Sequence, residues 1–208
     1  MEQTGVTIWF TGMSGAGKTA LAMPLEKELR QRGLKVERLD GDIVRQSLTR
    51  DLGFSKEDRD KNIERVTFVA KLLTRNGVAV LCSFISPYRA VRAKVAEEVG
   101  NFVEVYCYAP LETLIERDVK GLYKKALAGE IKNFTGISDP YEAPENAHVT
   151  IDSGSETIEE SLARVLAKLE ELGYVPPITA EAVEAGDEAY TSEEEAEIEA
   201  RLAALGYL

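Results

Sequence analysis

Cysteine and histidine are scarce in this sequence, which contains two cysteines and one histidine among 208 residues. Cys82 and Cys107 each lie inside an apolar run, and neither has a second cysteine or a histidine at metal-ligand spacing. We therefore expect two buried, reduced thiols in a cytoplasmic protein. The one histidine, His148, is expected at the surface or at a strand edge, where it is poorly placed to be a catalytic base.

Long hydrophobic runs are absent as well, since none approaches the ~20 apolar residues that a membrane-spanning helix needs. The N-terminal segment has no basic stretch before an apolar one, so we expect no signal peptide. The formal net charge of −11 argues against binding to nucleic acid or to anionic membranes. Nine of the 36 acidic residues but only one of the 25 basic residues lie within residues 180–208, so most of the acidic excess belongs to the C-terminal tail.

What the sequence does contain is an alternation of short apolar segments with helical patterns. Strands are expected at residues 6–11, 36–39, 77–84, 103–108 and 149–152. Helices are expected at residues 20–33, 55–76, 87–99, 111–129 and 156–173, with Ser55 as the N-cap of the second. This order predicts an α/β fold of the P-loop NTPase type, with a parallel sheet of about five strands and helices on both faces.

The acidic tail is expected to form a separate segment. Pro176 and Pro177 should end the main domain, so the predicted domains are residues 1–177 and residues 178–208. Residues 192–205 place Ile198, Leu202 and Leu205 at helical spacing, which predicts a short amphipathic helix after a loose linker. No side chain there offers chemistry for catalysis, so we expect this tail to serve contact or solubility.

The stretch GMSGAGKT follows the first expected strand and has the spacing of a phosphate-binding loop. In such a loop, backbone N–H groups close around phosphate oxygens, the lysine reaches the β- and γ-phosphates, and the hydroxyl binds Mg²⁺. The predicted ATP-binding residues are Gly12, Met13, Ser14, Gly15, Ala16, Gly17, Lys18 and Thr19. The sequence contains no Asn-Lys-x-Asp motif of the kind that reads guanine in GTPases. Asp40 and Asp42 are the carboxylates at strand ends, and neither is an unmistakable Mg²⁺ ligand.

A second group of polar side chains follows the strands next to this loop. Ligands of parallel α/β sheets bind beyond the carboxyl ends of the strands, so these side chains should face the phosphate loop. The group consists of Asp42, Arg45, Phe54, Arg59, Asn62 and Ser86. One carboxylate, two arginines, an aromatic ring and an amide suit an anionic, aromatic acceptor that carries a hydroxyl, which is the description of a nucleotide.

Each member of this group also has a purely structural interpretation. Asp42 could be a helix N-cap, and Phe54 could belong to the core. Arg59 and Asn62 could form the solvated face of a helix, and Ser86 before a proline could mark an ordinary turn. Residue types and spacing alone leave these alternatives open.

Several longer segments resemble one family of small kinases. They are LDGDIVR (39–45), LGFSKEDRDKNIERV (52–66), SFISPYRAVR (83–92), RDVKGLYKKALAGEIKNFTGI (117–137) and DPYEAPENA (139–147). Together they look like adenylylsulfate kinase, or APS kinase, over about residues 5–175. The resemblance implies transfer of a phosphate from ATP to the 3′-hydroxyl of adenosine 5′-phosphosulfate (APS), which gives 3′-phosphoadenosine 5′-phosphosulfate (PAPS).

The resemblance also implies a role for each matching residue. Asp42 is the acid/base residue beside the 3′-hydroxyl, and Lys18 and Thr19 act on ATP and Mg²⁺. The implied APS-binding residues are Asp42, Arg45, Phe54, Arg59, Asn62, Ile85, Ser86, Lys120 and Phe134. Phe54 and Phe134 would sandwich the acceptor adenine, and Lys120 belongs to a lid over both nucleotides. The serine that matches Ser86 is assigned in the family as a phosphoserine intermediate, whereas we expect direct in-line transfer without a covalent step.

The chain departs from the family pattern near the expected acceptor pocket. Ile43 stands where asparagine is usual, and Asn133 stands where glycine is usual. We expect a homodimer and a functional association with ATP sulfurylase, and neither nucleic acid nor a membrane as partner. Two alternatives remain open, namely another small-acceptor kinase such as a nucleoside kinase, and a nucleotide-sensing domain without turnover.

Overall fold

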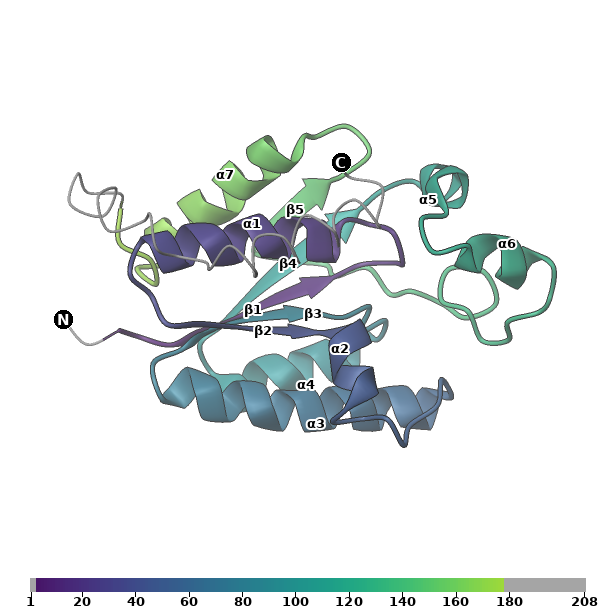
Figure 1. Ribbon diagram of the computed structural model, residues 1–208, viewed down its shortest axis with the longest axis horizontal. Helices are drawn as coiled ribbons and strands as arrows, with labels where there is room; N and C mark the ends of the chain where they lie inside the picture. The colour runs from purple at the N-terminus through teal and green to yellow at the C-terminus, as the bar shows by residue number, and fades with distance from the viewer. Residues whose placement is uncertain (1–2, 178–208) are drawn as a thin grey trace.

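The computed structural model describes residues 3–177 and contains one parallel sheet of five strands in the order β2-β3-β1-β4-β5. The strands are β1 (Val6–Thr11), β2 (Val36–Asp40), β3 (Ala79–Ser83), β4 (Phe102–Tyr108) and β5 (Val149–Asp152). Helices α1 (Lys18–Gln31) and α7 (Ile158–Glu171) cover one face, and α3 (Lys56–Arg75) and α4 (Arg89–Val99) cover the other (Figure 1). The expected parallel sheet with helices on both faces is therefore confirmed.

The middle of the sheet is buried on both faces. Every residue of β1 and β3 is buried, and this is the burial that near-continuous apolar strands require in a parallel sheet. Trp9 on β1 stacks on Phe84 with ring centroids 5.5 Å apart, and both rings belong to the core cluster that also contains Val66 of α3 and Val95 of α4. The carboxyl ends of β1, β2 and β3 consequently meet at one edge in fixed register.

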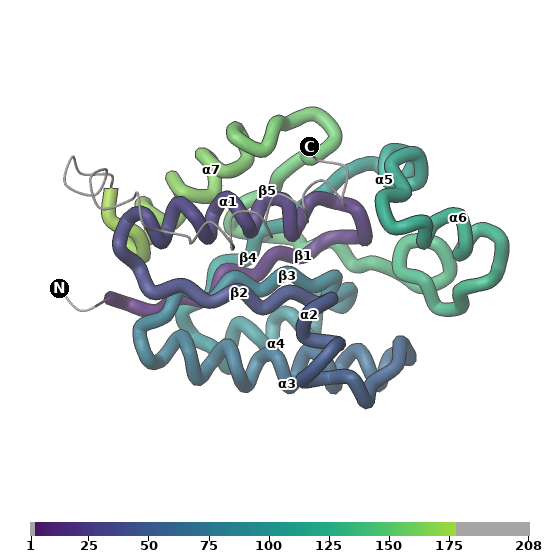
Figure 2. Tube along the Cα trace, viewed as in Figure 1, coloured from purple at the N-terminus to yellow at the C-terminus, as the bar shows by residue number. Residues whose placement is uncertain are grey.

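Two shorter helices and their loops project beyond that edge. They are α5 (Leu111–Arg117) and α6 (Leu122–Leu127), and the tube in Figure 2 shows them extending past the sheet. The single helix that we expected over residues 111–129 is wrong, because the chain breaks at Asp118. Asp118 has a φ of 26°, and its carboxylate accepts hydrogen bonds from the backbone N–H groups of Tyr123 and Lys124. Because of this break, α6 does not continue α5, and Lys120 between the two helices contacts Asp42 at the sheet edge.

The remaining differences from the sequence prediction are local. Helix α2 (Gly41–Gln46) was not expected, although Asp42 had been considered as an N-cap. Ser55 is the N-cap of α3 as predicted, and its hydroxyl accepts a hydrogen bond from the backbone N–H of Asp58. Within residues 3–177 no helix is both long and apolar enough to cross a membrane. The predicted tail helix at residues 192–205 lies outside the described residues.

Candidate active site

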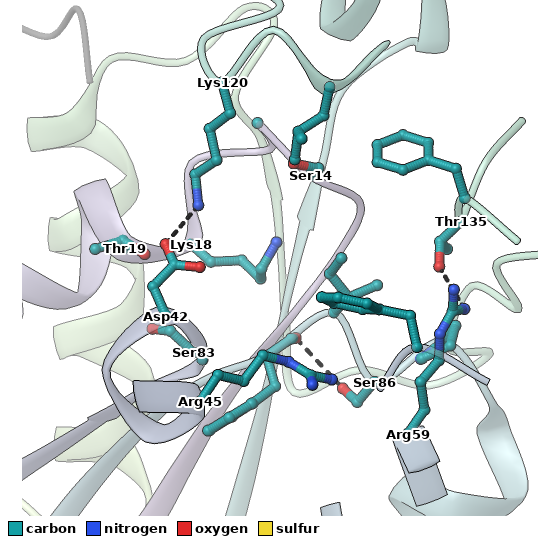
Figure 3. Close-up of a pocket in the computed structure, with 18 of the residues that line it drawn as sticks. Ser14, Lys18, Thr19, Asp42, Arg45, Arg59, Ser83, Ser86, Lys120 and Thr135 are labelled. Atoms are coloured by element: carbon teal, nitrogen blue, oxygen red, sulfur yellow. Dashed lines mark hydrogen bonds and ion pairs between the residues drawn. The ribbon is translucent and has the colours of Figure 1, made fainter. Parts of the chain in front are cut away.

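A cavity of about 520 Å³ opens at the carboxyl edge of the sheet. The phosphate loop between β1 and α1 forms one side, and α2, the start of α3 and the loop after β3 form the other. The predicted site residues among its lining are Ser14, Gly15, Gly17, Lys18, Thr19, Asp42, Arg45, Phe54, Arg59, Asn62, Ile85, Ser86, Lys120 and Phe134. The structure thus brings the predicted acceptor residues and most of the phosphate loop to one cavity, whereas Gly12, Met13 and Ala16 are not among its lining residues (Figure 3).

The phosphate loop depends on its glycines for its shape. Gly12 has a φ of 146°, and a Cβ atom there would lie 2.1 Å from the carbonyl oxygen of Cys107. Gly17 has a φ of 85° and forms the N-cap of α1, so the positive end of that helix points into the loop. The Lys18 ammonium folds back over the loop and donates hydrogen bonds to the carbonyl oxygens of Gly12 and Met13, at 2.8 and 2.7 Å.

Lys18 is held in an environment that disfavours its charge. Desolvation lowers the pKa of the Lys18 ammonium to about 8, despite the neighbouring carboxylates of Asp40 and Asp42, which raise it. Its hydrogen-bond acceptors are the carbonyl oxygens of Gly12 and Met13. Phosphate oxygens at this position would restore the charged form, so nucleotide binding should be linked to proton uptake.

This linkage gives a prediction about pH. Below pH 8 the empty site already carries the Lys18 proton, whereas above it the proton must be taken up as the nucleotide binds, so the affinity for ADP should fall by about tenfold per pH unit between roughly pH 8 and 10. Calorimetry in buffers of different ionisation enthalpy measures both the affinity and the proton uptake. Lys18→Arg is the control, since arginine stays charged and its pH profile should be flat. An equally flat profile for the unsubstituted protein would contradict the linkage.

Asp40 is the site residue that the sequence prediction undervalued. Its side chain is buried, accepts a hydrogen bond from the Thr19 hydroxyl at 2.8 Å, and caps α2 by accepting from the backbone N–H of Asp42 at 2.9 Å. The N-cap of α2 is therefore Asp40, so that interpretation of Asp42 is wrong. The feature of the sequence that could have identified Asp40 is its position at the end of β2, and the structure pairs it there with Ser83 of β3.

Asp42 projects from the first turn of α2 toward the lid side of the cavity. Its carboxylate accepts a hydrogen bond from the Lys120 ammonium at 2.6 Å, as Figure 3 shows. Lys120 lies 78 positions away in the sequence, in the loop between α5 and α6. Both side chains are substantially exposed, so a ligand can reach the carboxylate once the lysine moves aside.

Arg45 and Phe54 form the outer rim of the acceptor side. The Arg45 guanidinium lies over the Phe54 ring, 4.4 Å from its centroid, and donates to the carbonyl oxygen of Gly53 at 3.1 Å. Phe54 is 64% exposed, so its alternative assignment to the core is wrong. An exposed aromatic ring beside a cation is a surface on which a planar base can stack.

Arg59 and Asn62 lie on the cavity-facing side of α3, and the structure contradicts a solvated face for both. Asn62 is 4% exposed, and its side-chain oxygen accepts a hydrogen bond from the Thr49 hydroxyl at 2.7 Å. Arg59 donates to the Thr135 hydroxyl at 2.9 Å and to Asp139 at 3.0 Å, and it also contacts the carbonyl oxygen of Asn133. These acceptors lie on the segment that carries Phe134, on the opposite side of the pocket from Asp42 (Figure 3).

The lid contacts the phosphate loop through a residue that the sequence prediction missed. The Tyr123 hydroxyl, on α6, donates to the carbonyl oxygen of Ser14 at 2.9 Å. Its ring packs edge-on against Phe134, with centroids 5.1 Å apart. Tyr123 thus joins the lid to the phosphate loop, and Lys120 joins it to Asp42 on the acceptor side. Asn133 has a φ of 56°, a conformation that asparagine and glycine tolerate, so the departure from glycine at this position needs no change of backbone.

Ser86 is buried at the bottom of the acceptor side, next to Ile85. It is 2% exposed and has a φ of 37°, which is uncommon for a residue other than glycine. Its hydroxyl accepts a hydrogen bond from the Trp9 indole at 2.9 Å and lies 3.2 Å from the Thr11 hydroxyl. The position is more constrained than the ordinary turn considered from sequence.

The scarce cysteines and the histidine take the positions expected for them. Cys82 and Cys107 are buried free thiols, and burial raises the pKa of Cys107 to about 12. His148 is exposed just before β5, where its Nδ1 accepts a hydrogen bond from the backbone N–H of Glu104 at 3.0 Å. It is not among the residues that line the cavity.

Comparison with known proteins decides the family. A sequence model of the family described as adenylylsulphate kinase matches residues 4–152. The chain belongs to the adenylylsulfate kinase family. Its activity is therefore ATP-dependent phosphorylation of the 3′-hydroxyl of APS, which activates sulfate as PAPS. This assignment favours the APS kinase interpretation over another small-acceptor kinase.

Individual relatives of this kinase agree with the family match. A probable adenylyl-sulfate kinase of Pseudomonas aeruginosa is 66% identical over 168 residues, covering 81% of this chain and 78% of the relative. A probable bifunctional SAT/APS kinase 2 of Sorangium cellulosum is 61% identical over 173 residues, covering 83% of this chain but 30% of the relative. The structure of the Mycobacterium tuberculosis APS kinase with AMPPNP and APS is 44% identical, covers 81% of this chain and 99% of that chain, and has a TM-score of 0.77.

Proposed function

We propose that both substrates of the kinase share this cavity and that the phosphate passes directly from ATP to APS. The observation that carries this proposal is that the phosphate loop and the predicted acceptor residues line the same space. ATP would occupy the loop at residues 12–19, and APS would occupy the side formed by α2, α3 and the loop after β3. Transfer between two ligands in one space needs positioning and charge stabilisation, and no covalent intermediate.

Thr19 and Asp40 are the proposed Mg²⁺ ligands. A hydroxyl and a carboxylate 2.8 Å apart are hard oxygen donors, and Mg²⁺ commonly takes only one or two protein ligands together with water and phosphate oxygens. The residues present therefore fit the ion. When bound, the ion would neutralise charge on the transferred phosphate.

Asp42 is the proposed acid/base residue, and its carboxylate pairs with the Lys120 ammonium. The 3′-hydroxyl of APS would replace the Lys120 ammonium at the carboxylate, which could then accept the hydroxyl proton as the oxygen attacks. Lys120 would lose its hydrogen bond to Asp42 and would remain on the lid near the phosphates. The same lysine can thus hold the carboxylate before binding and contribute positive charge afterwards.

The proposed contacts to APS divide by chemistry. Phe54 and Phe134 would stack on the adenine, with Arg45 and Arg59 attracting the phosphosulfate and Asn62 contacting the ribose. Ile85 would line the pocket. Ser86 is proposed as a residue that shapes this pocket and not as a phosphate carrier, because its buried hydroxyl is held by Trp9 and Thr11.

Turnover with different acceptors tests the proposed function. ADP release should be rapid with APS and near background with adenosine or cytidine, because neither nucleoside offers a phosphosulfate to the arginines. Lys18→Met serves as the inactive control. Binding of nucleotide and APS without ADP release would instead support a nucleotide-sensing domain.

The lid provides a further prediction. Residues 118–136 carry four lysines spaced by glycines, and the contacts of Lys120 and Tyr123 attach this segment to both sides of the cavity. Amide hydrogen exchange in this segment should slow when ADP and APS are added together, since bound anions would draw the lysines inward. The buried strand β1 is the internal control and should not change. Full protection of the segment in the empty protein would contradict its assignment as a lid.

The proposed partners and location depend on the thiols and on the relatives. We propose a cytoplasmic homodimer, with the buried free thiols supporting a reducing compartment. The bifunctional SAT/APS kinase relative supports a functional association with ATP sulfurylase, the enzyme expected to supply APS. Light scattering of the purified chain at several concentrations would measure the dimer. Steady-state PAPS formation with and without ATP sulfurylase would measure the association.

A further inference from the structure

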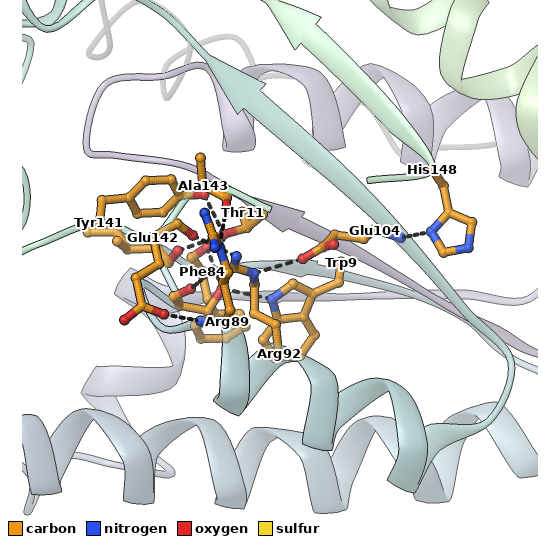
Figure 4. A network of polar contacts seen from close by, with 12 residues as sticks. Trp9, Thr11, Phe84, Arg89, Arg92, Glu104, Tyr141, Glu142, Ala143 and His148 are labelled. Carbon is orange, nitrogen blue, oxygen red and sulfur yellow. Dashed lines mark hydrogen bonds and ion pairs between the residues drawn. The ribbon is translucent and has the colours of Figure 1, made fainter. Parts of the chain in front are cut away.

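A network of polar contacts joins α4 and β4 to Ser86 on the acceptor side of the cavity (Figure 4). At its centre is Arg92 on α4, which is 3% exposed and is not among the residues that line the cavity. Burying a guanidinium is costly unless every part of it finds an acceptor. The structure therefore raises the question of what this buried cation does so close to the site.

Arg92 reaches three separate parts of the chain. Its Nε donates to the Glu104 carboxylate on β4, its Nη1 donates to the carbonyl oxygen of Ser86, and its Nη2 donates to the carbonyl oxygen of Glu142, each at 2.7 Å. Glu104 supplies the compensating charge, and its carboxylate is itself mostly buried. Lysine could not reproduce this pattern, because a single ammonium cannot span three acceptors that a planar fork reaches at once.

The first part that Arg92 holds is the loop after β3. Trp9 and Thr11 on β1 fix the same loop, since the Trp9 indole donates to the Ser86 hydroxyl at 2.9 Å and the Thr11 hydroxyl donates to the carbonyl oxygen of Ile85 at 2.8 Å. Ser86 keeps a φ of 37° under these contacts. A backbone conformation of this kind persists only when its surroundings fix it from several directions.

The second part is the segment at residues 139–147. Its Tyr141 hydroxyl lies 2.9 Å from the Thr11 hydroxyl, and the backbone N–H of Glu142 donates to the carbonyl oxygen of Pro87 at 2.9 Å. Arg92 and Thr11 consequently join the segment to the loop after β3. The segment begins at Asp139, whose carboxylate accepts a hydrogen bond from Arg59.

We propose that Arg92 is a positioning residue for the acceptor site. It reaches neither ligand and acts through two connections, directly on Ser86 and, by way of residues 139–147, on Arg59. It thereby keeps the two sides of the acceptor pocket at a fixed separation. The inference rests on the proposed assignment of APS to this side of the cavity.

Kinetics of Arg92→Lys test the proposal. The KM for APS should rise by about tenfold while the KM for ATP stays within about twofold, because only the acceptor side loses its support. Trp9 is the only tryptophan of the chain, so its fluorescence reports on the Ser86 contact. The emission of the empty variant should differ from that of the unsubstituted protein, and saturating APS should reduce the difference.

A second variant and a control allow the proposal to be tested even if Arg92→Lys does not fold. Tyr141→Phe removes only the hydroxyl that meets Thr11, and should raise the KM for APS by a smaller factor of about three. Arg89→Lys is the matched control, since Arg89 also lies on α4 and contacts the same segment at Ala143 and Glu145, but is half exposed. It should leave both KM values within about twofold.

The outcomes separate this proposal from the proposed function. If the folded variants raise both KM values equally, or leave the KM for APS unchanged, Arg92 supports the fold in general and the proposal is overturned. If the unsubstituted protein does not turn over APS at all, the proposed function fails before any variant is compared. A selective rise for APS in Arg92→Lys and Tyr141→Phe, absent in Arg89→Lys, supports the positioning role.

Discussion

Asp42→Asn is expected to lower kcat by about a hundredfold or more while both nucleotides still bind, since the amide keeps the shape of the side chain but cannot accept a proton. Rapid-quench measurement of PAPS formation gives the chemical step, and equilibrium binding of ADP and APS gives the affinities. The carboxylate is placed for the task by α2, whose first turn is fixed by the Asp40 cap. Its exposure allows the acceptor hydroxyl to approach.

Asp51→Asn is the matched control for this substitution. Asp51 is also an exposed aspartate in an ion pair with a basic side chain, Arg65 at 2.6 Å, just as Asp42 pairs with Lys120 at 2.6 Å. It is not among the residues that line the cavity, so its loss should change kcat by no more than about twofold. Near-normal turnover of Asp42→Asn would move the acid/base role to Asp40, the other carboxylate at this edge.

The parts of the fold that could be predicted are those with a local signal. β1, the phosphate loop and α1 follow one another in the sequence, and each has its own composition and spacing. The same is true of α3, where Ser55 caps a long amphipathic helix. By contrast, the spacing of apolar residues predicts one continuous helix through Asp118. This spacing carries no information about the Asp118 carboxylate, which accepts hydrogen bonds from the first turn of α6 and ends the preceding helix.

The parts of the site that could not be predicted depend on contacts between distant residues. Asp42 meets Lys120 across 78 positions, and Arg59 meets Thr135 across 76. Asn62 reads as a surface residue of α3 until Thr49, which lies in the preceding loop, covers its amide. Residue type and family resemblance brought Asp42, Arg59, Asn62 and Lys120 forward as candidates, but the partners of these side chains are decided by tertiary packing.

The different surroundings of Asp40 and Asp42 also could not be predicted from the sequence. Two carboxylates flank Gly41 at the end of β2, and the sequence prediction placed only Asp42 in the site. The structure separates them by environment, since Asp40 is buried against Thr19 whereas Asp42 projects into the cavity. Two chemically identical groups thus acquire different proposed roles, one toward the metal and one toward the acceptor.

Arg59→Lys is expected to raise the KM for APS by about thirtyfold with little effect on the KM for ATP, because lysine cannot reproduce a forked contact. Steady-state kinetics with each substrate varied in turn measures the two effects separately. The Arg59 fork donates to Thr135, Asp139 and the Asn133 carbonyl. Arg59 could therefore serve APS in two ways, either by turning one nitrogen to the anion or by holding the segment that carries Phe134.

Asp139→Asn distinguishes these two ways. If Arg59 binds the anion of APS directly, removing the competing Asp139 charge should leave the KM for APS unchanged or lower it, because the guanidinium is freed for the ligand. If Arg59 acts only by holding the segment, Asp139→Asn should raise the KM for APS in the same way as Arg59→Lys. We expect the first result, since an amide oxygen at position 139 can still accept from Arg59 and so keeps its connection to residues 139–147, while the Thr135 hydroxyl and the Asn133 carbonyl hold the other contacts. Equal increases in the KM for APS and for ATP in Arg59→Lys would contradict both proposed roles, binding the anion of APS and holding the segment that carries Phe134. They would instead place Arg59 at the transferred phosphate.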